Sequence, residues 1–512
     1  MLSSTIVVDA RPEPEARRSE TPVLPGGAFV EGQWQSADLT LDVRDPQDGT
    51  LVGRVCTSTA QDVRRAITHI HRHLQIEPWP LRSRRQALEK AALLLGEQSA
   101  RFATIIAAES SKTITEAERE VRRCIETLRL SAAASTELSG STLDFEDSLA
   151  SGHKIGWYSR KPVGIVAAIT PFNDPLNLVA HKLGPALIAG NGVVLKPSER
   201  TPLSGLALVQ LLLEAGVPSG RIGAIVSGPG VAEALVTDEQ IDLISFTGGP
   251  RTAERIAAAA GAKKILSELG GNNATIVCAD ADPAAAAEAI VAGAFGVAGQ
   301  NCLSVQRVYV QTSLFERVLE EVTRGTQALR TGPKFDRRTD VGPLISEDEA
   351  RRVEDWVDEA LAAGASVHAG GQRQGAFYEP TVLTDVPAQC RVLRDEVFGP
   401  VVTLIPFVEV SDAVHAANDS EYGLQAGIFT QSMDLALAMA ENLHVGAVVI
   451  NETSDIRIDS MPFGGFKKSG VGREGVRYAV HAMTEPKNTI VNLGESGAPR
   501  QLLGGLPERT TP

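Results

Sequence analysis

Two reactive side chains stand close to glycines, where a chain can turn and present them to a cleft. Cys302 lies in residues 299–304, between an alanine-rich segment and an apolar run. A cysteine thiolate is a strong nucleophile toward a carbonyl carbon, although most free cysteines are small core residues. Glu268 ends an apolar run just before Gly270 and Gly271. Its carboxylate could act as a general base on water, the alternative being a solvated loop residue.

Three further segments place polar or glycine residues at the ends of short apolar runs. Asn173 is flanked by two prolines, which stiffen the backbone, so its amide is a candidate donor to an oxyanion or part of an ordinary turn. Lys196 and Glu199 follow the next apolar run, where they could contact ribose hydroxyls. Residues 247–249 (Thr-Gly-Gly) precede a helical segment, and the free N–H groups at such a helix start suit a pyrophosphate.

Two other patterns suggest sites that their surroundings do not support. Residues 470–475 match GxGxxG, but they follow Lys-Lys-Ser rather than a strand, so we expect no dinucleotide loop there. His69, His71 and His73 alternate in a polar stretch without a carboxylate or cysteine partner motif. We therefore expect a solvated face there and no metal site in the protein.

The order of apolar and helical segments predicts a framework that brings the candidate residues together. From residue 163 onward, strands are expected at 163–169, 192–195, 223–227, 243–246 and 264–266, with helices at 176–189, 203–215, 231–236 and 251–260. This alternation favours an open, doubly wound parallel sheet, which binds ligands at the carboxyl ends of its strands. The alternation restarts after Gly270 and Gly271, so we expect a second α/β lobe from about residue 270.

The composition is that of an ordinary soluble globular protein with two or three lobes. The 512 residues carry 49 basic and 63 acidic side chains, and the basic ones form no tract beyond pairs, which disfavours nucleic-acid and membrane partners. No apolar run approaches the ~20 residues of a membrane span. Five cysteines without a CxxC pair argue against a disulfide framework. Since residues 1–26 lack an apolar signal segment, we expect a cytoplasmic protein with loose termini at 1–26 and 498–512.

Taken together, these segments resemble the NAD(P)-dependent aldehyde dehydrogenase superfamily over about residues 27–495. Seven motifs occur in the order of that family, at residues 171–173, 196–199, 246–249, 268–271, 299–302, 396–400 and 462–470. Each motif is weak alone, but seven in order with sensible spacing are specific.

The resemblance implies a role for each candidate residue. Cys302 would attack the aldehyde, and the side chain of Asn173 with the Cys302 backbone N–H would hold the resulting oxyanion. Loss of hydride to the nicotinamide would leave a thioester, and a water activated by Glu268 would hydrolyse it. The implied cofactor contacts are Lys196 and Glu199 at the adenosine ribose, Thr247, Gly248 and Gly249 near the pyrophosphate, Glu396 at the nicotinamide ribose, and Phe398 beside the nicotinamide. Glu199 favours NAD, with NADP as the alternative.

The family fold implied is α/β, with a Rossmann-type cofactor domain, an α/β catalytic domain and a small β oligomerisation element. The expected boundaries are 27–141 with 160–268 for the cofactor domain, 269–480 for the catalytic domain, and 142–159 with 481–497 for the oligomerisation element. The resemblance implies a homodimer or homotetramer that acts on a small-molecule aldehyde.

The expected substrate pocket departs from that of members acting on fatty or retinal aldehydes, which surround the aldehyde with aromatic residues. Asp174 and the arginines Arg123 and Arg457 fall on segments that line the pocket in the family. We expect a small polar aldehyde, whose distal carboxylate or phosphonate would be anchored by the two arginines. The alternative is that both arginines pair with Asp174, Asp455 or Asp459 and anchor nothing.

Two other functions are alternatives to the hydrolytic oxidation of an aldehyde. A CoA-acylating semialdehyde dehydrogenase shares the fold, but such relatives typically lack the base, so Glu268 argues against it. A non-catalytic structural member of the family is the second. The joint presence of Cys302, Glu268, Asn173 and Lys196 argues against that alternative, because function depends on the site rather than on the fold.

Overall fold

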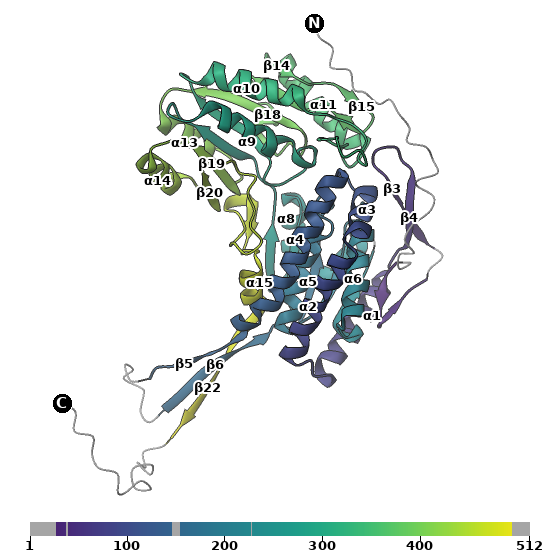
Figure 1. Ribbon diagram of the computed structural model, residues 1–512. Coiled ribbons are helices and arrows are strands. Elements are labelled where there is room, and N and C mark those ends of the chain that lie inside the picture. Colours follow the sequence, from purple (N-terminus) through teal and green to yellow (C-terminus); the bar gives the residue numbers. More distant parts are fainter. Residues whose placement is uncertain (1–26, 37–38, 146–153, 227, 494–512) are drawn as a thin grey trace, which may run out of the picture.

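Two open sheets, each covered by helices, form two lobes of the chain in the computed structural model (Figure 1), which describes residues 27–36, 39–145, 154–226 and 228–493. The termini predicted to be loose, 1–26 and 498–512, lie outside the described residues, as do 146–153 and 494–497 of the expected oligomerisation element.

The first lobe contains an eight-stranded sheet. Its strands are, in spatial order, β2 (Gln33–Trp34), β1 (Phe29–Val30), β9 (Ile222–Ala224), β8 (Gly192–Lys196), β7 (Ile165–Ile169), β10 (Leu243–Thr247), β11 (Lys264–Glu268) and β21 (Gly470–Val471). The five strands from β9 to β11 are parallel. Numbered along the chain from β7, they follow the doubly wound order 3-2-1-4-5, in which ligands bind where the order reverses, here between β7 and β10.

Both faces of this sheet are apolar, since alternate residues of each strand point to opposite sides. On β7, Val166 and Ala168 pack on one face while Ile165 and Ala167 pack on the other. The helices on the first face are α2 (Leu81–Glu97), α3 (Ser99–Glu109), α4 (Ile114–Ala133), α5 (Asn177–Ala189), α6 (Leu203–Ala215) and α15 (Val476–Ala482). Those on the second are α1 (Ala60–Ile76), α7 (Pro229–Thr237) and α8 (Pro250–Ala260).

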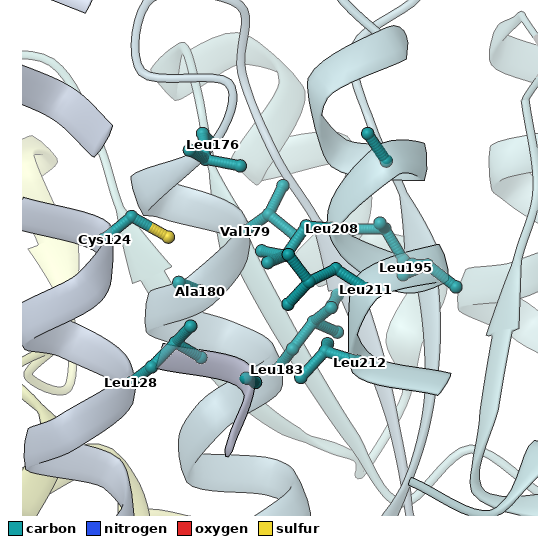
Figure 2. Packing of buried hydrophobic residues seen from close by; sticks show 14 of the residues in the cluster. Cys124, Leu128, Leu176, Val179, Ala180, Leu183, Leu195, Leu208, Leu211 and Leu212 are labelled. Carbon is teal, nitrogen blue, oxygen red and sulfur yellow. The ribbon is translucent and has the colours of Figure 1, made fainter. Parts of the chain in front are cut away.

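Helices α4, α5 and α6 pack closely enough to fix the residues at their N-termini. Leu183 of α5 and Leu128 of α4 are fully buried in the shared core (Figure 2). Buried carboxylates cap two of these helices, because the first N–H groups of a helix lack partners of their own. Glu120 accepts hydrogen bonds from the backbone N–H groups of Leu176 (2.8 Å) and Asn177 (2.9 Å) at the start of α5. Glu109 does the same at the start of α6.

The second lobe contains a seven-stranded sheet that is parallel except for one edge strand. Its order is β14 (Ser366–Ala369), β17 (Thr381–Thr384), β18 (Val401–Phe407), β13 (Val305–Gln311), β12 (Asn273–Val277), β19 (Gln425–Phe429) and β20 (Ala447–Ile450). The surrounding helices are α9 (Pro283–Phe295) and α10 (Phe315–Ala328) on one face, α13 (Val410–Asn418) and α14 (Met433–Asn442) on the other, and α11 (Glu347–Ala362) with α12 (Arg391–Arg394) at the edge.

A third sheet projects from the first lobe as an arm (Figure 1). It consists of β5 (Ser141–Leu143), β6 (Lys154–Pro162) and β22 (Thr484–Asn492), all antiparallel. Two short ribbons, β3 (Thr40–Arg44) with β4 (Leu51–Cys56) and β15 (Arg373–Gln374) with β16 (Phe377–Tyr378), complete the strands of the described residues. No helix in this part of the chain is long and apolar enough to cross a bilayer.

The predicted α/β class and the alternation of strands and helices are confirmed, with shifts at the ends of elements. The strand expected at 264–266 extends to Glu268 because both β10 and β21 pair with its last residues. The strand expected at 223–227 ends at Ala224, where its pairing with β8 and β1 stops. The domain boundaries given above remain a prediction.

Candidate active site

One cavity of about 960 Å³ lies between residues of the two lobes, at the carboxyl end of the first sheet. All thirteen residues singled out in the sequence line it. They are Cys302, Glu268, Asn173, Lys196, Glu199, Thr247, Gly248, Gly249, Glu396, Phe398, Arg123, Asp174 and Arg457. The cavity volume is within the range of small-molecule and cofactor sites.

Cys302 sits on the loop that leads from α9 to β13. The Asn273 side-chain amide donates to the Cys302 carbonyl at 2.7 Å, which fixes the backbone at the thiol. Burial raises the pKa of the Cys302 thiol, and the carboxylates of Glu396 and Glu268 raise it further, against the opposing charge of Arg457. Cys302 is also the one cysteine of the described residues that is not fully buried. A thiol whose pKa is raised in this way depends on a base to form the reactive thiolate.

The raised pKa of the Cys302 thiol predicts an unusual pH dependence of its alkylation. An ordinary thiol, with a pKa of about 8.5, approaches full ionisation near pH 9.5. Because the pKa of Cys302 is higher, its thiolate fraction continues to grow over that range. We expect the rate of iodoacetamide reaction at Cys302, followed by mass spectrometry of its peptide, to keep rising from pH 8 to 10 while that of a free cysteine peptide levels off. A plateau below pH 9 would contradict the raised pKa.

Glu268 ends β11, and its side chain is buried at the cavity wall. One carboxylate oxygen, Oε1, accepts a hydrogen bond from the Glu474 backbone N–H at 3.2 Å. The other, Oε2, has no hydrogen-bond partner among the described residues. Burial raises the pKa of Glu268 well above its usual range, and the nearby charge of Glu474 adds to the effect. A carboxyl group with a raised pKa and a free oxygen can take up a proton near neutral pH.

Glu474 and Lys182 form a buried ion pair behind Glu268. The Lys182 ammonium lies 2.7 Å from Glu474 Oε1 and donates to the Thr247 hydroxyl at 2.8 Å. Burial opposes ionisation of Glu474, but Lys182, Arg457 and His181 outweigh it and lower its pKa to about 2. The negative charge of Glu474 is thus part of what raises the pKa of Glu268.

A cation and glycine-rich turns line the part of the cavity at β8 and β10. Lys196 ends β8, and its ammonium lies 2.6 Å from Glu199 Oε1. Helix α8 begins directly after Gly249 with Pro250, which has no N–H group, and no side chain caps this end of the helix. A Cβ on Gly248 would lie 2.6 Å from the Phe246 ring. These residues fit a ribose next to a phosphate group.

Gly270 and Gly271 bring the second lobe close to this half of the cavity. The Gly271 N–H donates to Glu396 Oε1 at 3.0 Å, and a Cβ on Gly270 would overlap the other oxygen of that carboxylate. Burial raises the pKa of Glu396 to about 7. Phe398 has a left-handed backbone (φ 46°) and meets the ring of Phe172 edge to face at 5.7 Å.

Arg123 and Arg457 differ in which carboxylates they pair with. Arg123 Nη2 lies 2.8 Å from Asp459, and Nη1 lies 3.5 Å from Asp174, as the pairing alternative predicted. Arg457 pairs with none of the three expected aspartates. It lies 3.0 Å from Glu474 Oε2 and stacks 4.0 Å from the centre of the Phe463 ring.

Arg457 also retains an unused donor. Its Nε is buried and has no hydrogen-bond partner among the described residues, and its side chain is 9% exposed.

Asp174 is held by a buried ion pair with Lys112, which also lies 2.6 Å from Glu120. Burial opposes ionisation of Asp174, but the charges of Lys112 and Arg123 lower its pKa.

Comparison with known proteins decides the family. The model of the Aldehyde dehydrogenase family matches residues 34–489. The chain belongs to the aldehyde dehydrogenase family. It is 42% identical over 476 residues to the 3-sulfolactaldehyde dehydrogenase of Priestia aryabhattai, which covers 93% of this chain and all of that protein.

Solved aldehyde dehydrogenases share the fold. The glyceraldehyde-3-phosphate dehydrogenase GapN of Methanocaldococcus jannaschii, complexed with NADP, has a TM-score of 0.85 and 36% identity, covering 89% of this chain and 100% of that one. The NAD⁺ complex of the Bacillus cereus aldehyde dehydrogenase has a TM-score of 0.89 and 30% identity, covering 94% and 99%. This aldehyde dehydrogenase is therefore an NAD(P)-dependent oxidoreductase acting on aldehydes.

Sequence reasoning missed several charged residues of the aldehyde dehydrogenase site. Lys182 and His181 lie in α5, a helix in which every residue is buried. Two polar residues within an apolar helical segment were a signal that could have predicted buried charged partners of the site. Glu474 lies inside the GxGxxG match and places a carboxylate behind Glu268. Lys112 and Glu120 left no such signal, because both lie in segments of mixed polarity.

Proposed function

We propose that the chain oxidises a small anionic aldehyde to its carboxylic acid through a covalent adduct on Cys302. Cys302 Sγ attacks the aldehyde carbon as its proton passes to a base. The new oxyanion is held by the side-chain amide of Asn173, which makes no hydrogen bond to the described residues, and by the Cys302 backbone N–H. When bound, NAD(P)⁺ supplies the hydride acceptor. Glu268 then takes a proton from the water that hydrolyses the thioester.

We propose roles in cofactor binding from the contacts that the cavity residues make. The pair of Lys196 and Glu199 suits the two hydroxyls of the adenosine ribose, and the positive end of α8, which starts directly after Gly249, suits the pyrophosphate. A carboxylate at Glu199 would repel a 2′-phosphate, so we propose a preference for NAD over NADP. Glu396 and Phe398 suit the nicotinamide ribose and ring.

The single observation that carries the substrate class is the Nε of Arg457, which has no hydrogen-bond partner among the described residues. A buried, unpartnered N–H of a charged group costs stability, which a negatively charged substrate group would recover on binding. Two similar proteins are named for small aldehydes with an anionic end, 3-sulfolactaldehyde and glyceraldehyde-3-phosphate, whereas others are named for the uncharged lactaldehyde. Arg123, already paired with Asp459 and Asp174, is the weaker anchor.

Initial rates of NAD(P)H formation test this proposal. The panel consists of lactaldehyde, glycolaldehyde, 3-sulfolactaldehyde, succinic semialdehyde, phosphonoacetaldehyde, propanal and benzaldehyde, each with NAD and with NADP. We expect the anionic aldehydes to have the highest kcat/KM and NAD the lower KM. A preference for propanal or benzaldehyde would overturn the substrate class and leave the family unaffected.

The Arg457→Gln variant tests the anchor itself. Glutamine can still donate to Glu474 but lacks the charge, and a hydrogen bond to a charged group is worth about 1.5–3 kcal/mol. We therefore expect KM to rise about 10–100-fold for anionic aldehydes and less than about threefold for propanal. Arg122→Gln is the matched control, because Arg122 is exposed on α4 and absent from the cavity wall. Equal rises in KM for acidic and neutral aldehydes would contradict the role of Arg457.

We also propose that a second copy of the chain covers the arm formed by β5, β6 and β22. Most of β22 is exposed, and several large apolar side chains of the arm face solvent, namely Ile155, Trp157, Ile490 and Val491. Apolar groups exposed together on the neighbouring strands β6 and β22 mark an interface between chains.

A further inference from the structure

The loop that carries Cys302 begins in a conformation that ordinary residues avoid. Val297 (φ 53°, ψ 33°) and Ala298 (φ 52°, ψ 39°) are both left-handed, and Gly299 follows with φ 69°. Two consecutive left-handed residues with side chains, one of them β-branched, are strained, and such strain persists only where the surroundings enforce it. Some contact must therefore hold the turn in place.

One carboxylate of the first lobe makes that contact. The Val297 backbone N–H donates to Glu116 Oε1 at 2.7 Å. The other oxygen, Oε2, accepts from the backbone N–H of Thr113 at 2.8 Å and from its hydroxyl at 3.0 Å, which completes the N-terminal cap of α4. Both oxygens of Glu116 are thus used, one on its own helix and one on the loop of the other lobe.

The remaining anchors of the loop come mainly from the second lobe. Gln300 donates from its side-chain amide to the Val297 carbonyl at 3.1 Å and accepts from the Ile345 N–H at 2.8 Å. Asn301 donates to Asp455. A Cβ on Gly299 would overlap the Gly399 carbonyl, so the turn has no room to move that way. Glu116 is the contact that ties this turn to the lobe whose helix α4 also carries Arg123.

We propose that Glu116 is a positioning residue for Cys302. It locks the left-handed turn at Val297 and so sets where the thiol stands relative to the cavity wall formed by α4. This inference rests on the nucleophilic role proposed for Cys302. Placing a reacting group wrongly by about 1 Å can cost about 10²-fold in rate, so a side chain that holds the loop of the nucleophile can control turnover through that loop.

Two variants of Glu116 test the proposal. Glu116→Gln keeps the shape but offers only one acceptor oxygen for two N–H groups, and Glu116→Ala removes both acceptors. Thr113→Ala is the matched control, since it weakens the same helix cap and leaves the bond to Val297. We expect both Glu116 variants to lower kcat about 10–100-fold with KM changed less than about threefold. Amide exchange in residues 296–304 should quicken about tenfold or more, as expected for loss of a hydrogen bond.

Thr113→Ala should keep kcat and the loop exchange rate within about twofold of the original chain. Its Tm should fall by about as much as the Tm of the Glu116 variants, because all three weaken the same helix cap. Glu116 variants that match Thr113→Ala in both readouts would overturn the proposal, as would faster loop exchange with an unchanged kcat. A chain that oxidises no aldehyde before any substitution would instead defeat the proposed function. The exchange data would then still show whether Glu116 holds the turn.

Discussion

Replacing Cys302 by alanine is expected to lower kcat by about 10⁴-fold or more, the scale of loss seen when a covalent nucleophile is removed. The reason lies in the cavity, where Cys302 is the one incompletely buried cysteine of the described residues. Initial rates of NAD(P)H formation with the best aldehyde of the panel measure the effect. The KM for NAD should stay within about threefold, because Lys196 and Glu199 are untouched.

Cys278→Ala provides the matched control for the Cys302 substitution. Cys278 is a free cysteine buried among apolar residues of the second lobe and does not line the cavity. The control should keep kcat and lose some stability, since removing a buried side chain leaves a small void. If Cys302→Ala kept more than about a tenth of the rate, covalent catalysis at this position would be refuted.

The sheet and most of the site could be predicted from sequence because each left a local signal. Strand and helix periods give the alternation, and the alternation with short loops gives a parallel sheet whose carboxyl edge collects the residues at strand ends. Glu268 and Lys196 are the last residues of β11 and β8, as the pattern indicated. Ten of the thirteen named residues followed once the seven motifs were taken as one set, and Arg123, Asp174 and Arg457 followed from the pocket that the family resemblance implied.

The electrostatic partners of the site could not be predicted, because they depend on which buried helix faces which strand. Lys182 meets Glu474 from a position 292 residues away. Arg457 pairs with that same glutamate, whereas proximity in sequence favoured Asp455 and Asp459. The turn at Val297 could not be predicted either, since valine is among the residues least suited to a left-handed backbone and is held there by hydrogen bonds with Glu116 and Gln300.

Replacing Glu268 by glutamine is expected to lower kcat about 10²–10⁴-fold, the usual contribution of a general base. The amide is isosteric and can still accept from the Glu474 N–H through Oε1, so the geometry of the site survives. What disappears is the unpartnered Oε2, the oxygen free to take a proton from water or thiol. Adding CoA should restore no turnover. CoA-dependent turnover in the variant or the original chain would favour the acylating alternative.

The same substitution is expected to stabilise the protein, in contrast to a change at its neighbour. A carboxyl group whose pKa is raised by folding destabilises the native state once the pH exceeds its unfolded pKa of about 4.3. Glutamine removes that penalty, so the gain in Tm of Glu268→Gln should grow as the pH rises from 5 to 8. Glu474→Gln should lower the Tm instead, because breaking a buried ion pair by removing one charge costs about 3–5 kcal/mol.

These opposite shifts in Tm separate a functional carboxylate from a structural one. Glu474 is ionised and paired with Lys182 and Arg457, so the fold depends on its charge. Glu268 is buried with one oxygen unpartnered and near a like charge, an arrangement that works against folding and that fits its proposed role as general base. A Glu268→Gln variant that lost both activity and stability would show that Glu268 holds the structure together, and its assignment as the general base would fall.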